Sequence, residues 1–163
     1  MTRTTTAWLL DCGGGTLAAT GNGSVLHVVE DAALLFKVPL APPHCNRVLV
    51  WRDLLLPAVD LARYITGRAT SIDRPLSCVL GWRNATGASE YGVIVCQSLP
   101  RRIDISDDQR TEPNEGDAKR WSGIALAFFN HSGRATPIIH PGAPFGSMMA
   151  KDASERTEHQ RIA

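Results

Sequence analysis

The side chains best suited to metal binding or nucleophilic catalysis are scattered along the chain. The histidines are His27, His44, His131, His140 and His159, and the cysteines are Cys12, Cys45, Cys78 and Cys96. No two histidines stand four residues apart, and no Cys-x-x-Cys pair occurs. Local spacing therefore builds neither a zinc site nor a Ser/His/Asp triad, although distant residues can still converge in a fold. We expect no metal and no cofactor.

The cysteines have mainly apolar neighbours, among them Val79, Leu80, Ile94 and Val95. In such surroundings cysteine behaves as a small apolar residue. Disulfides are disfavoured because no signal-type apolar region follows the first residues. The sequence therefore predicts buried free thiols in strands.

One carboxylate has a neighbourhood that suggests catalysis. Asp11-Cys12-Gly13 is similar to the Asp-Thr-Gly of aspartic peptidases, in which two such loops bring paired carboxylates together to activate water. The motif occurs once, with Cys at the hydroxyl position, so this chemistry requires a homodimer. A dimeric peptidase that uses Asp11 is the least favoured of the functions considered.

The length and composition describe an ordinary globular protein. The chain has 163 residues, of which 44% are hydrophobic and 20% charged, and this suits one domain with one core. A formal net charge of +1 gives no electrostatic reason to expect nucleic acid or an anionic membrane as partner. The apolar runs are too short to span a bilayer. We expect a cytoplasmic protein without membrane insertion.

Glycine and proline divide the apolar runs. Ten prolines, fourteen glycines and only 6% aromatic residues favour a turn-rich, all-β chain over a helical bundle. Glycine-rich turns at 13–15 and 21–23 predict hairpins near the N-terminus. The other predicted strands include 25–30, 76–82, 91–96, 101–105 at a sheet edge, 121–129 and 134–139. Residues 106–119 hold almost no apolar side chains and are expected to form a long mobile surface loop.

The stretch from residue 52 to residue 67 carries the clearest local signals. Three leucines run into Pro57, which lacks a backbone donor, and this predicts a strand that ends there or meets a sheet edge. Either Leu55 or Leu56, whichever faces inward, is expected to be almost fully buried. Asp60 is placed to cap a short helix, and Gly67 to end it in a left-handed conformation.

Residues 50–61 resemble the central motif of CheW-like domains. In that motif an Asn-x-Arg-Gly turn leads into an apolar strand, a proline, two small apolar residues and Asp-Leu. The residues that match are Arg52, Pro57, Asp60 and Leu61, whereas Val50 replaces the asparagine and Asp53 the glycine. The loss of glycine matters if the turn needs a positive φ, which Asp tolerates less well than Gly. The resemblance is therefore to a divergent member.

Two further segments extend this resemblance to about residues 17–139. Val28 and Glu30 match a Val-x-Glu motif, and residues 92–95 match an apolar strand motif, which Cys96 follows where the family commonly has Asp. The resemblance places the Glu30 carboxylate on a docking face. From the residues alone, an exposed charge at a strand end explains Glu30 equally well.

The resemblance implies an all-β fold of two small intertwined five-stranded barrels, similar to SH3 and OB barrels, with one or two short helices. Residues 7–149 are expected to form one domain with two β subdomains, and residues 150–163 a flexible C-terminal tail. The segment 140–144 departs from the family pattern, in which a helix follows the last strand. Periodicity alone supports only a barrel or a sandwich.

The resemblance also implies a non-enzymatic coupling protein that links a chemosensory histidine kinase to chemoreceptors. The expected partners are the regulatory domain of the kinase and the cytoplasmic tip of a receptor. The interaction face of the family corresponds to Val28, Glu30, Arg52 and Asp53. The divergent motifs favour an accessory paralogue, in a system that controls type IV pili or surface motility, over the main flagellar coupler.

A small β-barrel that binds nucleic acid is a second function to consider. Such a module needs exposed aromatic side chains beside basic ones, and the candidates are Trp51-Arg52 and Trp82-Arg83. We expect both tryptophans to belong to the core instead.

Overall fold

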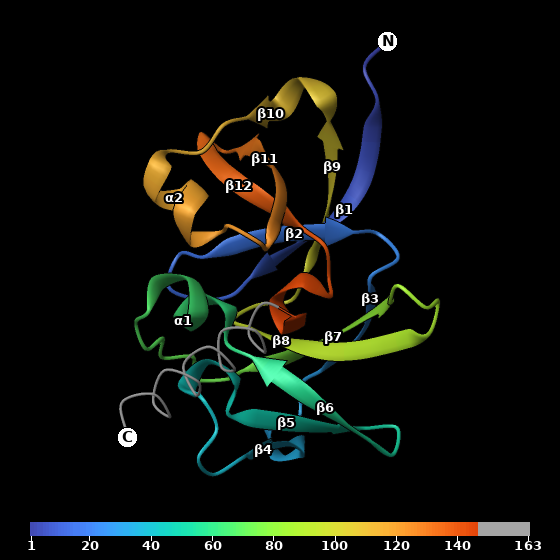
Figure 1. The fold of residues 1–163 in the computed structure, drawn as a ribbon, viewed down its shortest axis with the longest axis vertical. Coiled ribbons are helices and arrows are strands. Elements are labelled where there is room, and N and C mark those ends of the chain that lie inside the picture. The colour runs from blue at the N-terminus through green and yellow to red at the C-terminus, as the bar shows by residue number, and fades with distance from the viewer. Residues whose placement is uncertain (147–163) are drawn as a thin grey trace.

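Two curled six-stranded sheets make up most of the protein (Figure 1). The structure, a computed structural model, describes residues 1–146; the tail expected at 150–163 lies outside them. Sheet A has the strand order β10-β11-β12-β2-β1-β9, and sheet B has the order β3-β7-β8-β6-β5-β4. In Figure 1 sheet A lies above sheet B, and helix α1 lies at the level where they meet.

Sheet A is built from both ends of the described chain. Its strands are β1 (Thr4–Asp11), β2 (Leu17–Gly21), β9 (Arg101–Ser106), β10 (Arg110–Thr111), β11 (Ala125–His131) and β12 (Arg134–Ile139). β1 pairs antiparallel with β2 and β9, whereas β12 pairs parallel with β2 where Ile138 meets Ala19. This parallel contact joins the N-terminal hairpin to the C-terminal one.

Sheet B is formed by the segment between β2 and β9. Its strands are β3 (Val25–Val29), β4 (Leu35–Lys37), β5 (Arg47–Trp51), β6 (Leu54–Val59), β7 (Leu76–Arg83) and β8 (Ser89–Cys96). β6 pairs antiparallel with β5 and, at Ala58 and Val59, parallel with β8. The strands of sheet A come before and after those of sheet B along the chain, so the expected intertwined arrangement is confirmed.

The all-β class is confirmed, but each sheet has six strands where five were expected. Two edge strands are very short: β4 has three residues and β10 has two. An alternating pattern needs several residues to be readable, so strands of this length leave no clear signal in the sequence.

Short helical turns connect the strands. They are the α-helices α1 (Leu61–Thr66) and α2 (Glu115–Arg120) and the 3-10 helices η1 (Ala32–Leu34), η2 (Pro43–Cys45) and η3 (Asp107–Gln109). Residues 143–146 are helical as well, so the departure of residues 140–144 from the family pattern does not remove the helix after the last strand. Among the described residues, no helix is long and apolar enough to cross a membrane.

The predicted caps of α1 are present. The Asp60 carboxylate accepts a hydrogen bond from the Arg63 backbone amide at 3.0 Å, which satisfies one of the free donors of the first turn. Gly67 ends the helix with φ 70° and donates its amide to the Arg63 carbonyl. Leu61 and Ala62 are fully buried, in one core cluster with Leu10 of sheet A and Ile94 of sheet B. The helix therefore packs against both sheets.

The expectation of a long mobile loop at 106–119 was wrong, because η3, β10 and α2 occupy it. The Gln109 side chain accepts a hydrogen bond from the Ser106 amide at 2.8 Å, and the Asn114 side chain accepts one from the Asp117 amide, also at 2.8 Å. Polar side chains satisfy the backbone here. A shortage of apolar residues therefore did not mean a shortage of structure.

Two strand predictions need correction. The turn at 21–23 does not close a hairpin, because β2 lies in sheet A and β3 in sheet B. The strand expected from residue 121 begins at Ala125, while Trp121 ends α2 and is buried in the core. In both places the local sequence correctly indicates a turn or an apolar run. Which strands then pair, and where a strand begins, depends on residues that are distant in the chain.

Cys12, Cys78 and Cys96 are buried free thiols as expected, but Cys12 lies just after β1 and not in a strand. Cys45 lies in η2 and not in a strand. A hydrogen bond with Cys96, together with burial, raises the pKa of the Cys78 thiol. The Cys78 thiol consequently stays protonated, and the buried cysteines act as small core residues.

The leucines of β6 provide a direct test of this packing. Leu56 is 5% exposed, whereas its neighbour Leu55 is 70% exposed, which confirms that one of the pair is buried. We expect Leu56→Ala to lower the free energy of unfolding by about 2–5 kcal/mol, because it removes apolar contacts and leaves a cavity. Leu55→Ala, the matched control, should change it by about 0.5 kcal/mol or less. Urea denaturation measures both, and equal losses would contradict the assigned faces.

Candidate functional site

The turn between β5 and β6 presents two of the predicted site residues. Trp51 pairs with Leu54, so Arg52 and Asp53 form a two-residue hairpin loop. Their φ angles are 48° and 61°, both in the left-handed region, as a type I′ turn requires. Both side chains are exposed. The replacement of glycine by Asp53 therefore falls on a position with positive φ.

The Arg52 guanidinium is held by an aromatic ring. Its central carbon lies 4.5 Å from the centroid of the Trp51 ring, and Trp51 is itself only 9% exposed. Within residues 1–146 the recorded salt bridge joins Arg120 to Asp117, and none involves Arg52. The cation–π contact thus fixes the side chain while its N–H donors remain available at the surface.

The other two predicted residues come from the opposite edge of sheet B. Val28 lies on β3, pairs with Cys78 of β7 and is half-buried, while Glu30 follows the strand and is exposed. The chain then enters η1 and β4, whose Leu35 pairs with Leu49 of β5. Through the paired strands of the sheet, Val29 is level with Ser77 of β7 and Val95 of β8, next to the Ile94–Val59 pair at the end of β6. No hydrogen bond or ion pair in the described chain joins Glu30 to Arg52.

Sequence reasoning missed an apolar surface beside this turn. We call it the outer face, formed by Phe36, Val48, Val50, Leu55 and Pro57, which register across β4, β5 and β6. Phe36 is 51% exposed, Val50 36% and Leu55 70%. Their strand neighbours point inward: Leu49 and Leu56 are among the buried core residues.

A signal for the outer face did exist. Residues 47–51 and 54–59 are nearly continuous apolar runs, a pattern typical of strands covered on both faces. Within residues 1–146 only one face of β5 and β6 is covered. A contiguous exposed apolar patch of this kind marks a surface that a partner covers.

The residues behind the two other candidate functions have structural roles. The Asp11 carboxylate accepts a hydrogen bond from the Gly13 amide at 3.0 Å, which shapes the β1–β2 turn. Trp82 stacks on Phe145 with ring centroids 5.1 Å apart and donates to Glu90 at 3.0 Å. In the described part of the chain, no group of three or more His, Cys, Asp or Glu side chains could hold a metal ion.

Comparison with known proteins points to one family. A family model described as the CheW-like domain matches residues 8–149. Among solved structures, the crystal structure of the scaffolding protein TtCheW from Thermoanaerobacter tengcongensis is similar, with a TM-score of 0.61 and 16% sequence identity. That match covers 85% of this chain and 90% of the other. A search of curated proteins gave no match.

The strained turn yields a stability prediction. Asp53→Gly removes the cost of holding a residue with a Cβ in the left-handed conformation, about 1–2 kcal/mol in the folded state. It also gives the unfolded chain more conformational entropy, which lowers stability by about 0.4–1 kcal/mol. We therefore expect a net gain of about 0.5 kcal/mol in the free energy of unfolding. Asp73→Gly is the matched control, because Asp73 is exposed and has no positive φ, and it should destabilise the protein. A loss of stability in Asp53→Gly, measured by thermal melts, would show that the Asp53 side chain itself holds the turn.

Proposed function

The chain belongs to the CheW-like domain family, and on that basis we propose that it is a non-enzymatic coupling scaffold of a cytoplasmic chemosensory pathway. In this proposal it links the regulatory domain of a histidine kinase to the cytoplasmic tip of a chemoreceptor. The similarity in fold to the scaffolding protein TtCheW supports a scaffold role.

The observation that carries the proposal is the outer face with charged residues at its end. Phe36, Val50 and Leu55 supply apolar area, and Arg52 and Asp53 supply exposed charge beside it. An apolar centre with a polar rim is the usual anatomy of a protein–protein interface. Arginine is also enriched among the residues that contribute most to binding.

We propose that Val28, Glu30, Arg52 and Asp53 belong to one docking surface with the outer face. The resemblance of Val28, Glu30 and Arg52 to motif residues of the CheW-like family supports this grouping. The Arg52 guanidinium, held over Trp51, loses less freedom on binding than an unsupported side chain. Pre-organisation of this kind favours a role in docking over a purely structural one.

The departures from the family motif support an accessory role. Val50 stands where the family has a polar asparagine and adds apolar area to the outer face, with 36% of its surface exposed. Asp53 adds a negative charge at a turn that usually carries glycine. Both changes alter the surface that a partner reads, so we propose a partner set different from that of the main flagellar coupler, in a system that controls type IV pili or surface motility.

The docking surface can be tested by separating binding from folding. Arg52→Ala, Glu30→Ala and Leu55→Ala change exposed side chains and should leave the melting temperature within a few degrees. Each should weaken binding to the kinase regulatory domain or to a receptor-tip fragment by about 1–3 kcal/mol. Isothermal titration against both purified fragments, with thermal melts in parallel, gives the two quantities.

Arg83→Ala is the matched control, because Arg83 is another exposed arginine in sheet B, at the end of β7. It should bind both fragments as the wild type does. Unchanged affinity of the folded Arg52, Glu30 and Leu55 variants for both fragments would remove these residues from the interface.

A further inference from the structure

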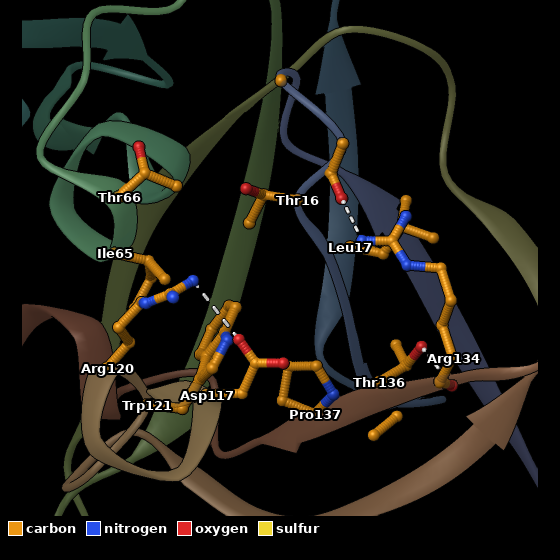
Figure 2. A pocket seen from close by; sticks show the side chains of 13 residues that line it. Thr16, Leu17, Ile65, Thr66, Asp117, Arg120, Trp121, Arg134, Thr136 and Pro137 are labelled. Carbon is orange, nitrogen blue, oxygen red and sulfur yellow. Dashed lines mark hydrogen bonds and ion pairs between the residues drawn. The ribbon is translucent and has the colours of Figure 1, made fainter. Parts of the chain in front are cut away.

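A polar cleft lies beside sheet A, away from the outer face. It has a volume of about 180 Å³, several times the ~30 Å³ that one water molecule occupies in the liquid. Its walls come from the β1–β2 turn, the end of α1, the end of α2 and strand β12, and Figure 2 shows their side chains around one opening. In Figure 1, α1 and α2 lie on one side of the molecule and the tip of the β5–β6 hairpin on the other.

Two arginines face each other across this cleft. Figure 2 shows Arg120, from α2, on one side and Arg134, from β12, on the other. Arg134 donates from Nη2 to the Gly15 carbonyl at 3.2 Å, and Arg120 pairs through Nη1 with Asp117 at 3.3 Å. A guanidinium has five N–H donors, so one contact orients each group and leaves other donors for a ligand.

The remaining lining adds hydrogen-bonding groups. Thr16 and Thr136 line the cleft and are 9% and 3% exposed, and the Thr136 hydroxyl donates to the Arg134 carbonyl at 3.4 Å. Gly14 and Gly15, with φ of 60° and 78°, close the β1–β2 turn without side chains that could fill the opening. The charged lining residues are two arginines and one aspartate, a net charge of +1.

We propose that this cleft binds a small phosphate group. A guanidinium matches the oxygens of phosphate and carboxylate equally well, and both are attracted by the net positive charge. The two arginines approach from different elements on opposite sides, however. A tetrahedral phosphate presents oxygens in several directions and can meet both, whereas a planar carboxylate presents two oxygens in one plane. The site is separate from the docking surface and does not depend on the proposed function.

The test is a titration of the isotope-labelled full-length chain with inorganic phosphate at constant ionic strength, followed by amide NMR. Phosphate should produce saturable shifts at Gly14, Gly15, Arg120 and Arg134. Arg120→Gln and Arg134→Gln should each weaken the affinity by about tenfold or more, because each removes a charge-assisted contact. Gln at 134 retains an N–H donor for the Gly15 carbonyl, and Arg120 is exposed, so both variants should stay folded.

Arg83→Gln is the matched control. Arg83 is exposed and donates to the Gly87 carbonyl at 2.9 Å, as Arg134 does to Gly15, but it lies outside the cleft. Its affinity for phosphate should equal that of the wild type. A parallel titration with acetate tests whether a carboxylate can replace phosphate. Acetate should bind at least about tenfold more weakly than phosphate. The proposal would be overturned if phosphate gave no saturable shifts or if Arg83→Gln lost as much phosphate affinity as the two cleft variants. It would also be overturned if acetate bound as well as phosphate.

Discussion

The burial of helix α1 between the two sheets is the contact on which the rest of the structure depends. A helix of six residues is far too short to be stable alone, so its stability comes from packing. Leu61 and Ala62 are fully buried, and they share one core cluster with Leu10 of sheet A and Ile94 of sheet B. Each sheet has one face covered by this shared core. This cluster joins the two sheets, and each sheet also has a smaller core cluster of its own, which includes Leu49, Leu56 and Val93 in sheet B and Ala19 and Phe129 in sheet A.

The packing of β6 explains why one surface of sheet B is left uncovered. Leu56 and Ala58 of β6 are 5% and 2% exposed and pack with Leu49 and Val93 in a core cluster formed by sheet B. Alternation along the strand then places Leu55 and Pro57 on the opposite side. These outward residues are apolar too, and the described chain does not cover them. Because β6 has apolar side chains on both of its sides and the described chain covers only one of them, the outer face is suited to form an interface.

The hairpin turn connects this packing to the surface charge. The two-residue loop between β5 and β6 requires positive φ at both central positions, yet it carries Arg52 and Asp53. Trp51 is buried beneath the Arg52 guanidinium, so a core residue holds a surface cation in place. Backbone strain of this kind is usually kept where function needs it. The strained turn belongs to the β5–β6 hairpin, which also carries the exposed apolar residues Val50 and Leu55.

The sequence by itself determined the local elements. Asp60 and Gly67 cap α1 as predicted, because a cap is a contact between residues three or four positions apart. The long β7–β8 hairpin was readable for the same reason, since its strands are neighbours in the chain. The family motif around Arg52 also identified the turn that presents two of the predicted site residues.

Only the tertiary structure decided which face of each apolar run is buried and which strands share a sheet. Nearly continuous apolar runs such as residues 54–59 have no alternation, so they do not reveal that Leu56 lies inside and Leu55 outside. The parallel contact between β2 and β12 joins residues more than a hundred positions apart, and no local signal records it. The cleft between Arg120 and Arg134 is lined by residues 14–17 and 134–137, which only the fold brings together, so it was not visible in the sequence. The apolar runs of β5 and β6 signalled the outer face, but they did not show which of their side chains are exposed.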